Sequence, residues 1–205
     1  MKRMAGYLLF LLAAVTLFTG CIATKVTSVW KDPAYQGSPK KVLVYAVLKT
    51  QMQRRVFEDE FVAHFKSRGV DAVPGYEVFS GEELVTKEVL TEKLTSLGFD
   101  SLLLTRVTGT RKELTQVPAR TTYPSGGYGG GYRGYYSAGY TATYTSSYTV
   151  EDYYAMTETS LFDVATEKMF WSGAGDTWMR DSDQKMIKDY VAMMMEAIRK
   201  DKVIP

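Results

Sequence analysis

Cysteine and histidine are nearly absent from this chain of 205 residues, which contains only Cys21 and His64. With one cysteine no internal disulfide can form, so the fold must be held together by packing. With one histidine, a zinc site would have to combine a single imidazole with carboxylates, which is unusual. A Ser-His-Asp arrangement would depend on His64, which lies beside Phe61 and Phe65 in a predicted helix. We therefore expect no metal, no cofactor and no catalytic histidine.

The chain also lacks an excess of charge of either sign. It has 25 basic and 23 acidic side chains, and two of the basic ones, Lys2 and Arg3, stand at the very start. The residues beyond position 21 carry 23 charges of each sign. Such a chain has no broad positive field, on which nucleic-acid binding depends, so the sequence predicts no nucleic-acid partner.

Long hydrophobic runs are missing except near the first residue. Residues 7–18 form an apolar stretch that follows Lys2 and Arg3 and leads to Thr19-Gly20-Cys21. The stretch is too short to span a bilayer, which takes about 20 apolar residues. A basic start, an apolar middle and small residues at the end are the layout of a secretory signal.

The end of this stretch, Leu17-Phe18-Thr19-Gly20-Cys21, resembles the lipobox of bacterial lipoproteins, with Phe18 where that family usually has Leu. The resemblance implies that residues 1–20 are removed as a signal peptide and that Cys21 is acylated, with diacylglycerol and palmitate. Several acyl chains on one residue suffice for a stable anchor. The alternative is an ordinary signal peptide followed by a free thiol.

The residue after the lipobox bears on location. In lipoproteins of this kind an Asp there favours the inner membrane, so Ile22 implies the cell outer membrane, on its periplasmic face. The lipid bilayer is then a partner through acylated Cys21. Residues 21–40 are predicted to be a lipidated tether. Three apolar side chains would also let this segment dock as an extra edge strand: Val26, Val29 and Trp30.

From residue 41 to residue 205 the sequence predicts a single α/β (α+β) domain. Apolar runs and helical periodicity give the order β-α-β-α-β-β-β-α, with parallel crossovers in the first half and a mixed sheet in two or three layers. The predicted strands are 41–48, 70–73, one that starts with 100–104, 150–164 and 168–172, and a hairpin turn is expected at Thr166-Glu167. The predicted helices are 51–68, one carrying Leu90, Leu94 and Leu97 after a possible capping box at 80–83, and 181–200. The first two helices are expected to end at Gly69 and Gly98, each of which is followed by an apolar residue.

Four segments of this domain look like uncharacterised proteobacterial envelope lipoproteins. They are the strand at 41–48, Phe-Glu-Asp-Glu-Phe at 57–61, Leu-Gly-Phe-Asp-Ser-Leu-Leu-Leu at 97–104 and the stretch 161–172. The order of elements is also similar to the α/β domain of the curli-secretion lipoproteins and to the amino-terminal domain of the Tol-system propeller protein. The second likeness concerns topology alone and implies no function.

A low-complexity insertion at about 112–148 is rich in tyrosine and glycine. Six tyrosines recur every four residues, and in an extended chain this even spacing puts them on one face. We expect a strand from about Tyr140 onward, and residues 105–122 would form the opposite arm of a long β-ribbon. The tyrosine face is a possible partner surface for another envelope protein, for sugar rings or for a second copy, and the alternative is a tolerated filler. Its residues are Tyr128, Tyr132, Tyr136, Tyr140, Tyr144 and Tyr148.

Clusters of acids and methionines allow further interpretations. The acids at 58–60 and 82–83 are expected on solvated helix faces, and those at 181–183 at a helix cap. A hydrolase that pairs two distant carboxylates remains an alternative. In the last helix the apolar face is Ile187, Tyr190, Val191, Met194 and Ile198. The methionines beside it are expected in the core, with an exposed binding strip as the alternative.

Together these patterns predict a non-enzymatic, membrane-anchored lipoprotein of the bacterial envelope. We expect a structural or accessory subunit in envelope assembly or transport that acts by protein–protein contact or self-association. The alternatives are a peptidoglycan- or glycan-binding module and, less favoured, the hydrolase with a carboxylate pair.

The lipobox resemblance makes a direct prediction about the mature protein. Because the leader is removed and Cys21 modified, the purified native chain should begin at residue 21 and carry the mass of several acyl chains there. Intact-mass and peptide mass spectrometry measure both properties. A native chain that retains Met1, or a free thiol at position 21, would contradict the predicted anchor.

Overall fold

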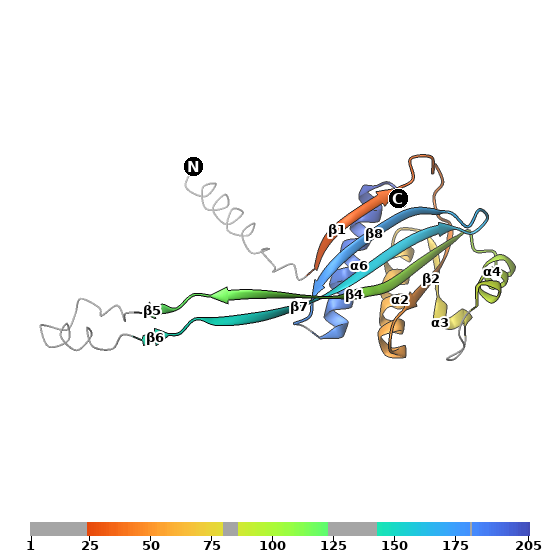
Figure 1. Cartoon of the computed structure of the whole chain (residues 1–205). Coiled ribbons are helices and arrows are strands. Elements are labelled where there is room, and N and C mark those ends of the chain that lie inside the picture. Colours follow the sequence, from red (N-terminus) through yellow and green to blue (C-terminus); the bar gives the residue numbers. More distant parts are fainter. Residues whose placement is uncertain (1–23, 80–85, 123–142, 181) are drawn as a thin grey trace, which may run out of the picture.

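The computed structural model describes residues 24–79, 86–122, 143–180 and 182–205. Within them a six-stranded mixed sheet carries helices on both faces, and a long two-stranded ribbon leaves the sheet at one end (Figure 1). The predicted α/β fold with a mixed sheet is thus confirmed. Cys21 and the possible capping box at 80–83 lie outside the described residues.

The main sheet has the strand order β1-β8-β7-β4-β2-β3. Its strands are β1 (Thr24–Lys31), β2 (Lys41–Val47), β3 (Asp71–Pro74), β4 (Ser101–Val117), β7 (Tyr148–Asp163) and β8 (Met169–Trp178). Two short strands, β5 (Arg120–Thr122) and β6 (Thr143–Thr145), pair with each other. The helices are α2 (Gln51–Lys66), α3 (Gly75–Val78), α4 (Lys87–Ser96) and α6 (Asp183–Lys200).

The parallel half of the sheet follows the sequence prediction closely. β2 lies between β3 and β4 and is parallel to both. The helix α2 ends at Gly69, which has a φ of 76°, and there the amide of Val70 donates to the carbonyl of Phe65 over 3.1 Å. Gly98 ends α4 in the same way with a φ of 70°. Both helix ends were predicted from a glycine followed by an apolar residue. Leu97, predicted on the buried face of α4, is instead its exposed C-cap.

The first described residues are a strand of the sheet and not a tether. β1 pairs antiparallel with β8, from Thr24 opposite Thr177 to Lys31 opposite Trp171, with a bulge between Val26 and Ser28. The docked edge strand, weighed as the alternative, is therefore what the structure shows. The tether prediction is wrong for residues 24–31, because pairing with β8 satisfies their backbone groups.

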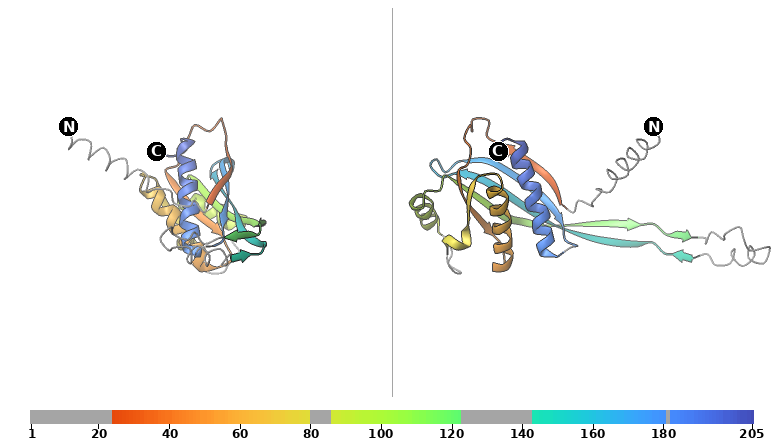
Figure 2. Two further views of the ribbon diagram at one scale, coloured as in Figure 1. Left: turned by 90° about the vertical axis from the view of Figure 1, so that its left-hand side faces the viewer. Right: turned by 180° about the vertical axis from the view of Figure 1, so that it is seen from behind.

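The two faces of the sheet are covered unequally. α2 and α6 lie side by side on one face, where they bury the larger core cluster, which includes Phe61, Leu103, Leu161 and Trp171 (Figure 2). On the other face α3 and α4 cover a smaller cluster around Leu43, next to β3, β2 and β4. The molecule thus has three layers over its parallel half and two layers over β7, β8 and β1.

The antiparallel half is longer than predicted. β7 and β8 form the expected hairpin, and Glu167 adopts a φ of 56° in its turn. β8 then continues from the predicted end at residue 172 to Trp178. Its glycines allow close packing of α6, because a Cβ added at Gly173 would lie 3.0 Å from the sulfur of Met194. The glycines concealed this part of the strand in the sequence.

The last helix confirms the predicted apolar face. Its N-cap is Ser182, whose hydroxyl accepts from the amide of Lys185 over 3.4 Å, whereas the predicted Asp181 lies outside the described residues. All five predicted face residues are buried. Met195 is fully buried too, and Met193 is partly buried against the same cluster. Met193 and Met195 therefore belong to the core, as expected, whereas Met186 is half-buried and lies outside the core cluster.

One prediction about the acids is wrong. Glu58, expected on a solvated helix face, is completely buried. Its carboxylate accepts from Nε of Arg54 over 2.8 Å, from the amide of Ala46 over 3.0 Å and from the amide of Tyr76 over 2.8 Å. The guanidinium of Arg54 also lies 4.5 Å from the ring centre of Tyr45. This carboxylate joins α2 to the end of β2 and to the start of α3.

The Glu58→Ala substitution should destabilise the chain by about 3–5 kcal/mol, because it leaves the buried Arg54 without its carboxylate. The matched Glu60→Ala variant removes an acid of the same helix that pairs with the half-exposed Lys188, and should cost about 1 kcal/mol or less. Urea unfolding followed by circular dichroism measures both. Equal losses in the two variants would contradict the role given to Glu58.

Candidate functional site

The most unusual feature of the molecule is that β4 and β7 are much longer than their neighbours. They pair antiparallel from Ser101 opposite Asp163 to Val117 opposite Tyr148. The neighbouring β8 ends at Trp178, opposite Tyr154. Beyond this point two strands continue alone, and residues 112–122 and 143–153 are here called the ribbon (Figure 1). The predicted β-ribbon is thus present in its described part.

The ribbon is exposed on both faces, and its charges are concentrated at its base. There, Lys112 donates to Glu151 over 2.7 Å. Farther out, over 114–122 and 143–150, Arg120 is the one charged residue among those described. The large side chains are open to solvent, with exposed fractions of 62% for Leu114, 69% for Tyr144 and 53% for Tyr148. This outer part offers apolar and aromatic contacts with little charge.

The predicted tyrosine face is only partly within the described residues. Tyr144 and Tyr148 are described and exposed, as a partner surface requires. The other four, Tyr128, Tyr132, Tyr136 and Tyr140, lie outside the described residues. The strand predicted from about residue 140 onward is not continuous, because β6 ends at Thr145 and β7 begins at Tyr148. Pro118, which has no amide hydrogen, stands in the matching gap of the other arm, between β4 and β5.

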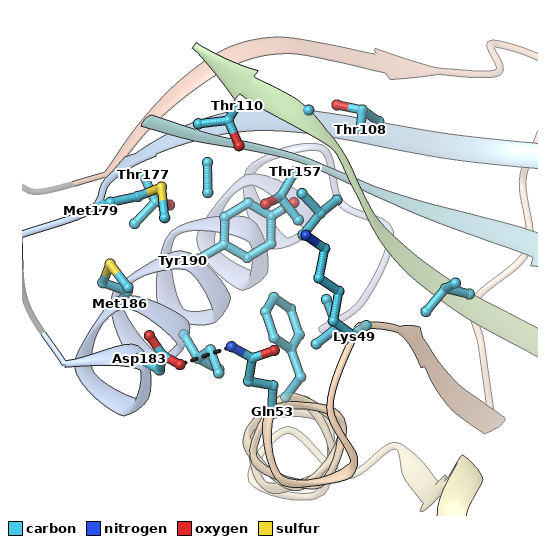
Figure 3. A pocket seen from close by; sticks show the side chains of 17 residues that line it. Lys49, Gln53, Thr108, Thr110, Thr157, Thr177, Met179, Asp183, Met186 and Tyr190 are labelled. Carbon is cyan, nitrogen blue, oxygen red and sulfur yellow. Dashed lines mark hydrogen bonds between the residues drawn. The ribbon is translucent and has the colours of Figure 1, made fainter. Parts of the chain in front are cut away.

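A second feature lies at the base of the ribbon, on the face that carries α2 and α6. It is a hollow of about 580 Å³ between the sheet and the first turns of both helices, here called the base groove (Figure 3). Its lining is largely apolar. The lining includes Val47, Phe57, Val107, Ala155, Thr177, Met179, Met186, Ile187 and Tyr190.

A bulge in β4 shapes one wall of this groove. Val107 pairs with Thr157 and Gly109 with Met156, so Thr108 is an extra residue in β4. The Thr108 hydroxyl donates to the carbonyl of Met156 over 3.2 Å. A bulge increases the local twist and bends its strand. It stands where β4 passes from the covered sheet into the ribbon.

Tyr190 and Asp183, two polar residues of the lining, are hydrogen-bonded to neighbouring side chains. The hydroxyls of Tyr190 and Thr159 are 3.0 Å apart, and those of Thr159 and Thr105 are 2.9 Å apart. Burial raises the pKa of Tyr190, so its phenol stays neutral at physiological pH. Asp183 is the one acid in the lining, and it accepts from the amide nitrogen of Gln53 over 2.8 Å (Figure 3). Among the residues that the structure describes, the groove therefore brings no two carboxylates together.

Two further candidate groups, His64 and the carboxylate of Asp152, interact with neighbouring side chains of the fold. His64 is half-buried on α2, and burial together with the nearby Arg68 lowers its pKa. The carboxylate of Asp152 accepts from the indole nitrogen of Trp178 over 3.1 Å and from Arg180 over 2.7 Å. Among the described residues no group of three or more His, Cys, Asp or Glu side chains could hold a metal ion.

Two features could not be found from the sequence. The base groove is built from β2, α2, β4, β7, β8 and α6, which are far apart in the chain, so no local pattern indicates it. The buried Glu58 follows Arg54 by four residues, a spacing typical of a surface ion pair as well. In the part of the chain that the structure describes, no helix is long and apolar enough to cross a membrane.

Comparison with known proteins gives similar structures only. No protein-family model and no curated protein matches the sequence. The PelC dodecamer from Paraburkholderia phytofirmans is similar with a TM-score of 0.46 and 14% identity, over 84% of this chain and 94% of that one. The lipoprotein GNA1162 from Neisseria meningitidis has a TM-score of 0.43 and 13% identity, over 79% of this chain and 99% of that one.

The exposure of the ribbon predicts a clear contrast between two leucines of β4. Leu114→Ala, in the ribbon, should change the free energy of unfolding by about 0.5 kcal/mol or less. Leu103→Ala, at a fully buried position of the same strand, should cost about 2–5 kcal/mol. Urea unfolding measures both. A loss above about 2 kcal/mol for Leu114→Ala would mean that the ribbon is folded against the rest of the chain.

Proposed function

We propose that this protein is a non-enzymatic lipoprotein of the bacterial envelope, anchored in the outer membrane by acylated Cys21. In this proposal it serves as a structural or accessory subunit in envelope assembly or transport, and it acts by holding a partner protein through its ribbon. The observation that carries the proposal is the ribbon itself, which is exposed on both faces and nearly free of charge beyond its base.

The physical argument is that such a ribbon gains little by standing alone in water. An isolated two-stranded hairpin is marginally stable, and open strand edges carry unpaired amide and carbonyl groups. Exposed tyrosine and leucine side chains add contact area at a low entropy cost. A partner protein would satisfy the edges and cover Leu114, Tyr144 and Tyr148. A second copy of this chain is one possible partner.

The position of the first strand supports a partner close to the membrane. Thr24 lies opposite Thr177, beside the point where the ribbon leaves the sheet. Cys21 precedes Thr24 by three residues, which span at most about 10 Å. One described arm of the ribbon, residues 112–122, extends about 35 Å at 3.3 Å per residue. An anchor at Cys21 would therefore hold the base of the ribbon near the bilayer surface.

A glycan-binding module is the second candidate, and one observation favours it. On the sheet face away from α2 and α6, a hollow of about 350 Å³ is lined by Tyr154 and Trp178 together with Arg111 and Asp176. Arg111 donates to Asp176 over 3.0 Å. Sugar rings could lie on the two aromatic rings, and their hydroxyl groups could bond to the ion pair of Arg111 and Asp176. This candidate makes cell-wall peptidoglycan the ligand.

The test uses a ribbon variant that combines Leu114→Ser, Tyr144→Ser and Tyr148→Ser in the full chain. In living cells, crosslinking followed by mass spectrometry should show at least a tenfold loss of the partner, because the exposed apolar contacts are gone. The control variant combines Met52→Ser, Val89→Ser and Leu97→Ser, which are exposed apolar residues outside the ribbon, and it should keep the partner.

Sedimentation with purified peptidoglycan separates the two candidates. Two results together would favour the glycan-binding module. The wild type would bind peptidoglycan and Trp178→Ala would not, and the ribbon variant would keep the same crosslinked protein partner as the wild type. A ribbon variant that keeps every crosslink of the wild type would overturn the proposal, and the ribbon would then be a tolerated insertion.

A further inference from the structure

The base groove opens beside the first described residue of the chain. The hydroxyl of Thr24 donates to the hydroxyl of Thr177 over 3.2 Å, and Thr177 is part of the groove lining. Residues 21–23 join Cys21 to Thr24 and span at most about 10 Å. Whatever Cys21 carries is therefore held within a short distance of the groove.

The lining of the groove matches a hydrocarbon chain. Three of its apolar side chains are unusually open to solvent, with exposed fractions of 54% for Val47, 46% for Val107 and 46% for Met179. Exposed apolar side chains that gather around one hollow indicate a binding site. Met179 and Met186 add flexible side chains that adapt to an irregular ligand. The volume of about 580 Å³ lies within the range of small-molecule sites.

The charged groups at the groove leave its floor apolar. Lys49 and Asp183 are both exposed, and the amino group of Lys49 points toward Thr157 and Tyr190, whereas Asp183 lies beside Gln53 and Met186 (Figure 3). Asp183 is already bonded to Gln53. The floor itself is formed by the rings of Phe57 and Tyr190 and by Ile187. An occupant without charge along its length fits this distribution better than a charged ligand does.

We propose that the base groove binds one acyl chain of the lipid on Cys21. This inference rests on the acylation of Cys21 in the proposed function. It adds an intramolecular site, in which the protein buries one acyl chain of its own anchor while it is away from a bilayer. The driving force is the removal of methylene groups from water, and insertion into a membrane empties the groove again.

The experiment compares two forms of the protein. One is the acylated protein, purified and freed of detergent. The other, here called the unacylated chain, is residues 21–205 with Cys21→Ser, made without the leader. Palmitate is the probe, and it competes with a dansyl-labelled fatty acid whose fluorescence rises on binding. The unacylated chain should bind one palmitate. The acylated chain should bind it at least tenfold more weakly, because its own acyl chain occupies the groove.

Two pairs of variants of the unacylated chain locate the site. Met179→Lys puts a charge at the groove and should weaken palmitate binding at least tenfold. Met156→Lys makes the same change on the opposite face of the sheet, at a similar exposed fraction of 37%, and should leave binding within twofold. Ala155→Phe fills the groove, and Ala174→Phe is its control on the opposite face. Circular dichroism and Tm confirm that each variant folds.

The result that would overturn the inference is an unacylated chain that does not bind palmitate. Equal weakening by Met179→Lys and Met156→Lys would overturn it as well. An acylated chain that binds palmitate as tightly as the unacylated one would show that its own acyl chain lies elsewhere. A native protein in which Cys21 is not acylated is a separate result. Mass spectrometry would then find an unmodified Cys21, while the unacylated chain would still bind palmitate.

Discussion

The antiparallel pairing of β4 with β7 is the constraint on which the rest of the structure depends. The inner half of this pair is largely buried, with the fully buried Leu103 opposite Leu161 in the core. A slip of one residue would put these two leucines on opposite faces of the sheet, so the core determines the register. The outer half continues the same ladder into solvent. The ribbon therefore needs no packing of its own to keep its two arms aligned.

The base groove follows from the same arrangement. α2 and α6 cover the sheet only as far as their first turns, while β4 and β7 extend beyond them (Figure 2). The strands at this boundary still carry apolar residues on the helix side, such as Val107 and Ala155, and no further turn of helix covers them in the described structure. The ribbon and the groove are thus two results of a mismatch in length between strands and helices.

The sequence predicted the parts of the fold that are encoded locally. A continuous apolar run predicted β2, and Gly69 and Gly98 predicted two helix ends, because each of these signals acts over a few residues. It failed where a partner is distant in the chain. The burial of Glu58 depends on the amides of Ala46 and Tyr76, and the docking of β1 depends on β8. The base groove requires six elements at once, so its residues could not be recognised as a site.

The bulge at Thr108 has a consequence for how the ribbon can change. Inside the sheet the odd-numbered residues of β4, such as Leu103 and Val107, point to the helices, whereas after the bulge the even-numbered Thr110 does. Each residue beyond the bulge keeps its partner in β7, so loss of Thr108 would leave the core pairs intact and the outer side chains on the faces that they occupy now. The direction of the ribbon would change, because the bulge bends β4 and increases its local twist. A single-codon deletion at this point can therefore re-aim the ribbon while its contact surface and the hydrophobic core stay the same.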